Sequence, residues 1–103
     1  LYGADDCSCF VSGVLKLVGK DVGCITTGVL ASMSKTNVSL KPGVIITRYG
    51  TSRSNHTMIY LGTSSEGDHM VVDCSSDKNG VMVRTVSEDY LKQYRYILDP
   101  DTI

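Results

Sequence analysis

The sequence predicts one α+β domain, with amino-terminal helices packed on an antiparallel β-sheet meander. Three observations support this fold class. Apolar residues recur at helical spacing in the first third of the chain, a Pro-Gly turn follows, and the remainder alternates in short strand-like runs. Helices that precede a series of neighbouring strands are typical of an α+β domain. A length of 103 residues with 42% hydrophobic residues is enough for a single core, so we expect one domain over residues 1–103.

The first helix is predicted over residues 8–18. Its apolar side chains recur at intervals of one and three residues, which gathers them on one helical face. They are Phe10, Val11, Val14, Leu15 and Val18. Gly19 is expected to end this helix, and Asp6 can cap its start. A shorter helix is predicted over residues 27–33.

Strands and one more short helix are predicted after the turn at Lys41-Pro42-Gly43. The expected strands cover residues 44–49, 56–61, 69–74, 81–86 and 94–98. Ser87 is the expected N-cap of the short helix between the last two strands.

Pairing of the second and third strands brings two polar side chains together. The register that matches the apolar residues sets Asp73 opposite His56 and His69 opposite Tyr60. Directly opposed side chains have Cβ atoms about 4.5–5.5 Å apart, so the carboxylate can accept a hydrogen bond from the imidazole. A tighter turn would instead pair His56 with His69, but it leaves apolar residues unpaired. We therefore prefer Asp73, with His69 as the alternative partner.

Cys7 stands where the first helix begins. The positive end of the helix dipole and the free N–H groups there favour a thiolate. The same start of the helix, at Cys7 and Ser8, can hold an oxyanion. A nucleophilic thiol also needs a base, and His56 oriented by Asp73 is the best candidate in the sequence.

The other cysteines have a plainer interpretation. Cysteine usually packs as a small apolar residue, so burial in the core is favoured for Cys9, Cys24 and Cys74. A bond between Cys7 and Cys9 is not expected, because side chains two apart on a helix diverge. A zinc site of Cys7, Cys9, His56 and Cys74 fits the usual ligand spacing poorly. No metal and no other cofactor is therefore expected.

Charge and hydropathy exclude several partners. Ten basic residues stand against eleven acidic ones, for a net charge of −1, and no run of like charges occurs. Nucleic-acid binding is therefore not expected. The longest apolar runs fall far short of the roughly 20 residues that span a bilayer, so membrane insertion is not expected either. The chain starts with Leu1 and has no leader pattern, which favours a piece excised from a longer multidomain protein.

Three motifs together resemble the NlpC family of cysteine peptidases. They are Asp6-Cys7-Ser8-Cys9-Phe10-Val11, Leu40-Lys41-Pro42-Gly43 and His56-Thr57-Met58-Ile59-Tyr60-Leu61-Gly62. These bacterial and phage cell-wall hydrolases have a stripped-down papain-like fold. The resemblance implies that Cys7 is the nucleophile and His56 the base, and it puts Asp73 in the third polar position. The chain departs from the family pattern at Cys9 and Val44, where the family usually has Gly and Asp.

The resemblance also implies a substrate. It indicates a cysteine hydrolase that cuts amide bonds in peptidoglycan stem peptides, as an endopeptidase beside D-glutamate or as a muramoyl-L-alanine amidase. The expected location is outside the cell, on the cell wall, or in a phage particle or lysin. Glycan-cleaving or wall-binding modules can accompany such a domain. The alternatives are a relative that binds wall fragments or a partner without cutting, and, ranked lower, the zinc module.

Overall fold

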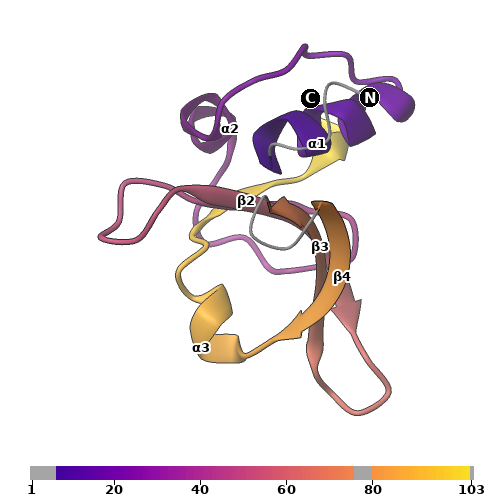
Figure 1. The fold of residues 1–103 in the computed structure, drawn as a ribbon, viewed down its shortest axis with the longest axis vertical. Helices are drawn as coiled ribbons and strands as arrows, with labels where there is room; N and C mark the ends of the chain where they lie inside the picture. Colours follow the sequence, from indigo (N-terminus) through magenta and orange to yellow (C-terminus); the bar gives the residue numbers. More distant parts are fainter. Residues whose placement is uncertain (1–6, 76–79, 103) are drawn as a thin grey trace.

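The computed structural model describes residues 7–75 and 80–102 (Figure 1). Its elements follow in chain order. They are α1 (Cys7–Leu17), α2 (Thr27–Met33), β1 (Ile45–Arg48), β2 (His56–Thr63), β3 (His69–Ser75), β4 (Gly80–Val86), α3 (Glu88–Leu91), β5 (Tyr96–Leu98) and a closing 3-10 turn (Pro100–Thr102). The predicted order of helices and strands is confirmed.

The strands form one antiparallel sheet in the order β4-β3-β2-β1-β5. The first four strands are the predicted meander, and β5 returns to pair with β1 at the other edge. The α+β class is therefore confirmed.

Helix ends follow the capping residues in the sequence. Gly19 adopts a left-handed φ of 88°, and the Lys20 N–H returns to the Leu15 carbonyl at 2.8 Å, which ends α1. The Ser87 hydroxyl accepts a hydrogen bond from the Tyr90 N–H at 3.1 Å and caps α3, as predicted. Asp6, the expected cap of α1, lies outside the described residues.

The sheet has an apolar core on each face. One core packs under α1 and α2 and contains Phe10, Val11, Leu15, Leu30, Ile45, Ile59, Cys74 and Leu98. The other packs under α3 and contains Val44, Ile46, Met58, Tyr60, Val71, Leu91, Tyr94 and Ile97. Figure 1 shows α1 and α2 on one side of the sheet and α3 on the other. Alternate residues of β2 therefore belong to different cores.

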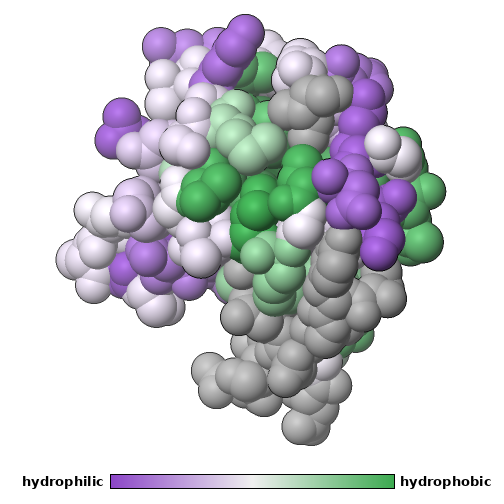
Figure 2. Space-filling model, turned by 90° about the horizontal axis from the view of Figure 1, so that it is seen from above, coloured by the Kyte–Doolittle hydropathy of each residue, from purple (hydrophilic) through white to green (hydrophobic). Residues whose placement is uncertain are grey.

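The side that carries α1 and α2 keeps some apolar surface. Seen from above, hydrophobic side chains gather near the middle of this side and hydrophilic ones lie around them (Figure 2). Leu17 and Val18 at the end of α1 and Val29 in α2 are among the exposed apolar residues. Within residues 7–75 and 80–102, no helix has the length and hydropathy that crossing a membrane requires.

The register of the β2–β3 hairpin differs from the prediction. Ile59 pairs with Val72 and Tyr60 with Val71, so Asp73 lies across from Met58 and not from His56. β2 continues to Thr63, two residues past its expected end, and β3 begins at His69, as predicted. A bulge between Tyr60 and Gly62 accommodates the change, and the φ of 107° at Gly62 suits a glycine. The shift is two residues, so each side chain keeps its predicted face.

A disulfide joins Cys9 to Cys24, with a Cα–Cα distance of 4.8 Å. The expectation that both cysteines pack as core residues is wrong, since Cys24 is exposed and Cys9 only half-buried. Cys74 is buried in the core, as expected, and neither Cys74 nor Cys7 belongs to the disulfide. The disulfide ties the first turn of α1 to the segment before α2.

Removal of this disulfide should destabilise the domain. The two cysteines are 15 residues apart, and closing a loop of that length corresponds to about 3 kcal/mol in the free energy of unfolding. We expect a Cys9→Ser/Cys24→Ser variant to lose free energy of unfolding of about that size, measured by urea unfolding without reductant. Reduced wild type is the matched control and should unfold with the variant. Equal stability of the variant and the oxidised wild type would contradict the prediction.

Candidate active site

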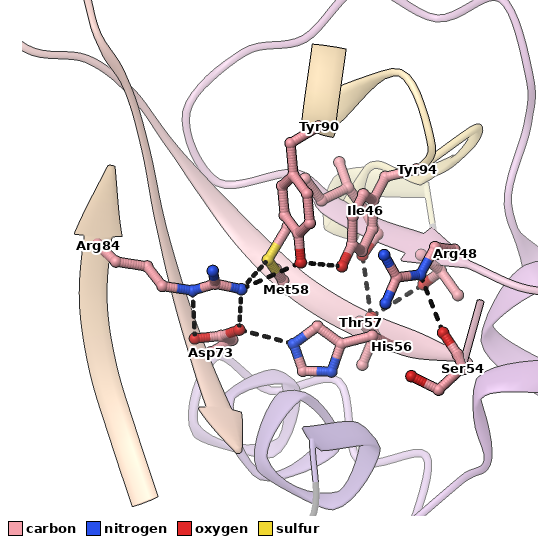
Figure 3. Close-up of polar contacts among 11 residues, drawn as sticks. Ile46, Arg48, Ser54, His56, Thr57, Met58, Asp73, Arg84, Tyr90 and Tyr94 are labelled. Atoms are coloured by element: carbon pink, nitrogen blue, oxygen red, sulfur yellow. Dashed lines mark hydrogen bonds and ion pairs between the residues drawn. The ribbon is translucent and has the colours of Figure 1, made fainter. Parts of the chain in front are cut away.

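The imidazole of His56 lies between a carboxylate and a thiol. Its Nε2 donates a hydrogen bond of 2.6 Å to Oδ2 of Asp73 on β3 (Figure 3). The Cys7 side chain, at the first residue of α1, lies close enough to the ring to act on its pKa. Because Nε2 is bound to Asp73, Nδ1 is the nitrogen left to face the thiol. The three predicted residues are therefore brought together.

The contact between His56 and Asp73 is a diagonal one. Asp73 lies two residues along from the position directly opposite His56, and diagonal neighbours on one sheet face remain within reach of long side chains. Only 15% of the His56 side chain and 3% of the Asp73 side chain are exposed. The predicted contact is confirmed, although the predicted register is not.

Arg84 on β4 is the second partner of Asp73. Its Nη2 donates to Oδ2 at 2.9 Å, and its Nε donates to Oδ1 at 3.4 Å. Nη2 also contacts the Tyr90 hydroxyl at 3.3 Å and the Met58 sulfur at 3.5 Å. The nearly buried carboxylate is therefore bound by two cationic side chains.

Tyr90, Tyr94 and Arg48 form a further group of side chains near His56. The Tyr90 and Tyr94 hydroxyls are hydrogen bonded at 2.7 Å, and the Tyr94 ring meets the His56 ring edge-on with centroids 6.3 Å apart. The Arg48 guanidinium lies 5.1 Å from the Tyr94 ring centroid and donates to the Ser54 carbonyl and to the Gln93 side chain. Figure 3 shows Tyr90, Tyr94 and Arg48 near the imidazole.

The surroundings of His56 favour its protonated form. Burial lowers the pKa of His56, but hydrogen bonds to Asp73 and Cys7 outweigh burial and raise the pKa to about 9, from an ordinary value of 6.5. At neutral pH the ring is therefore an imidazolium.

Asp73 stays ionised for a related reason. Burial alone raises the pKa of Asp73, yet hydrogen bonds from His56 and Arg84 outweigh it and hold the pKa below the ordinary value. The carboxylate is thus a permanent acceptor for Nε2 of His56, which fixes the ring orientation and leaves Nδ1 for Cys7.

The other predicted site residues have different outcomes. His69 does not join His56, because its Nδ1 shares a hydrogen bond of 2.7 Å with the Tyr60 hydroxyl. The alternative pairing of the two histidines is therefore wrong. Ser8 is the second residue of α1, as expected for the start of the helix.

Sequence reasoning missed Arg84. A single arginine in a predicted strand is usually a solvated charge, so nothing in its local sequence marks Arg84 as a site residue. The β3–β4 register explains the contact between Arg84 and Asp73. In it Val71 pairs with Arg84 and Asp73 with Met82. Arg84 and Asp73 therefore share a sheet face as diagonal neighbours.

Metal binding finds little support in this arrangement. The proposed zinc set loses Cys9 to its disulfide with Cys24. Among the side chains that the structure describes, no group of three His, Cys, Asp or Glu is placed to hold a metal ion.

A groove of about 380 Å³ lies next to the site. Its lining includes His69, Glu88 and Lys92, and it shares Tyr94 with the group of side chains near His56. Cys7, His56 and Asp73 do not line this groove.

Stability should fall at alkaline pH because His56 binds its proton more tightly in the folded state. The stabilisation that protonated His56 gives to the folded state is complete below about pH 6.5 and is lost as the pH rises through about 9. At 1.36 kcal/mol for each pKa unit, the loss is about 3 kcal/mol. Urea unfolding between pH 6 and pH 10 measures it. His56→Gln should lack this slope, whereas His69→Gln should keep it; parallel curves for wild type and His56→Gln would contradict the assignment.

Comparison with known protein families gives a match. The model of the NlpC/P60 family matches residues 2–98, which is nearly the whole chain. No curated protein and no solved structure gives a significant match. Members of this family are in general cysteine peptidases or amidases that act on peptidoglycan. The matched residues include Cys7, His56 and Asp73, and the chain belongs to the NlpC/P60 family.

Proposed function

We propose that this chain is a cysteine hydrolase that cleaves an amide bond in peptidoglycan stem peptides. One observation carries the proposal. The Cys7 thiol at the start of α1 lies close enough to His56 to raise the pKa of the ring, and Nε2 of the ring donates to the buried Asp73 carboxylate. A thiol, an imidazole and a group that orients the imidazole are the components of nucleophilic amide hydrolysis.

The first half of the reaction forms a thioester. The Cys7 thiolate attacks the carbonyl carbon of the scissile amide, and the carbonyl oxygen becomes an oxyanion. Free N–H groups in the first turn of α1, at Cys7 and Ser8, are suited to stabilise that charge. The His56 imidazolium then gives its proton to the leaving amine, the carbon–nitrogen bond breaks, and the acyl group remains on Cys7.

The second half returns the enzyme to its starting state. Neutral His56 takes a proton from a water molecule, whose oxygen attacks the thioester carbonyl. The carbon–sulfur bond breaks, the carboxylic acid product leaves, and the Cys7 thiolate again faces an imidazolium. Asp73 remains ionised throughout and holds the ring in one orientation.

Two bonds fit this chemistry equally well. An endopeptidase would cut beside D-glutamate, and an amidase would cut the muramoyl-L-alanine bond. Both reactions pass through the same thioester on Cys7 and need no cofactor. Which of the two bonds is cut depends on the residues that bind the substrate. The masses of the products distinguish the two reactions.

We also propose that the protein acts outside the cytosol, as a secreted or wall-associated enzyme or in a phage particle or lysin. Peptidoglycan lies outside the cytoplasmic membrane. The Cys9–Cys24 disulfide supports the proposal, because such bonds persist mainly in oxidising compartments. Glycan-cleaving or wall-binding modules in the same parent chain would suit this setting.

Digestion of purified muropeptides tests the proposed reaction. We expect wild type to cut stem peptides, and Cys7→Ala to lose activity by at least about 10³-fold, because the covalent step requires the thiolate. Cys74→Ala is the matched control and should keep activity, since Cys74 is buried in the core. Mass spectrometry of the products identifies the bond.

Alkylation separates a hydrolase from a binding-only relative. Iodoacetamide should modify Cys7 of folded wild type much faster than Cys74, because only Cys7 lies beside an imidazolium. Reaction of Cys7 at the rate of an ordinary thiol, together with intact muropeptides from several wall types, would overturn the proposal and favour binding without cutting.

A further inference from the structure

Asp73 Oδ2 accepts hydrogen bonds from two side chains at once. His56 Nε2 is 2.6 Å away and Arg84 Nη2 is 2.9 Å away. A second Arg84 nitrogen, Nε, reaches Oδ1 at 3.4 Å. The two contacts from Arg84 restrict rotation of the carboxylate about its bond to Cβ, which a single contact at Oδ2 would not do.

Arg84 is itself held in place. It lies on the edge strand β4, where an arginine side chain would ordinarily extend into water. Here its Nη2 donates to the Tyr90 hydroxyl at 3.3 Å, and its guanidinium lies 5.4 Å from the centroid of the Tyr90 ring. Tyr90 is bound in turn by the Tyr94 hydroxyl at 2.7 Å. The orientation of Arg84 is therefore determined by α3 and the residues after it.

We propose that Arg84 is a positioning residue that fixes the Asp73 carboxylate, and through it the His56 imidazole, with Tyr90 holding Arg84 in turn. This inference rests on the proposed hydrolase function. Arg84 itself is not expected to touch the reacting atoms. Its effect reaches Cys7 only through Asp73 and His56.

The physical need for Arg84 follows from the burial of Asp73. Only 3% of the Asp73 side chain is exposed, so water cannot supply the contacts that His56 leaves unfilled. A carboxylate bound by the imidazole alone would be free to turn, and the ring would turn with it. Misplacement of a reacting group by about 1 Å can cost 10²-fold in rate. Lysine would keep the charge but has no second nitrogen with which to grip both oxygens.

Four variants test the inference: Arg84→Met, Arg84→Lys, Asp73→Asn and the double variant Arg84→Met/Asp73→Asn. Turnover of muropeptides and alkylation of Cys7 by iodoacetamide at pH 7 are measured on each. We expect Arg84→Met to lower kcat about tenfold with little change in KM, and to slow alkylation of Cys7. Arg84→Lys should fall between Arg84→Met and wild type.

The double variant is the decisive comparison. If Arg84 acts only through Asp73, Arg84→Met should cause no further loss of kcat or of alkylation rate once Asp73 is Asn. Arg95→Met is the matched control, because Arg95 is exposed and lies outside the group of side chains near His56. It should behave as wild type in both assays. Tyr90→Phe, which removes a single hydrogen bond to Arg84, should show a smaller loss of the same kind and remains informative if Arg84→Met does not fold.

Three results would overturn the inference. One is a full further loss from Arg84→Met in the Asp73→Asn background. Another is a rise in KM with unchanged kcat, which would make Arg84 a substrate contact. The third is lower unfolding stability with unchanged kcat and alkylation, which would make its role structural. Alkylation needs no substrate, so Arg84 can be judged even if wild type cuts no muropeptide and the proposed function fails.

Discussion

The Asp73 carboxylate is the constraint around which this side of the molecule is arranged. An ionised group that is almost wholly buried is stable only when cationic or hydrogen-bonding partners surround it. The sheet supplies His56 from one neighbouring strand and Arg84 from the other. Tyr90 and Tyr94 then fill the space beside these cations. The same group that orients the imidazole therefore determines which side chains can lie on this sheet face.

Much of this arrangement could be predicted because it depends on local patterns. Apolar spacing and capping residues gave the helices, including α2 at residues 27–33, and alternation gave the strands. The partnership of His56 and Asp73 was predicted correctly from a register that was wrong by two residues. A two-residue slip preserves the face on which each side chain lies, so the pair survived as diagonal neighbours. The error arose at the turn, where a bulge before Gly62 lengthens the hairpin.

The missed features are those that depend on long-range geometry. Arg84 meets Asp73 only through the pairing of β3 with β4, and its strand shows no pattern that distinguishes it from a solvated edge. Cys9 and Cys24 belong to a helix and a loop whose approach no local pattern encodes. Neither contact could be recovered from spacing along the chain. The family match identifies the chemistry to be expected, whereas these contacts show how this member holds its groups in place.

The disulfide bears on how Cys7 can be reduced again after its thiol is oxidised. Cys9 is two residues away on the same helix, where the two side chains diverge, and its sulfur is bonded to Cys24. Cys9 therefore does not resolve a sulfenic acid formed on Cys7, and a small thiol from outside has to reduce it. A reductant strong enough to open the disulfide would also free the thiols of Cys9 and Cys24. Handling of the protein therefore calls for a reductant mild enough to regenerate Cys7 and leave the Cys9–Cys24 bond closed.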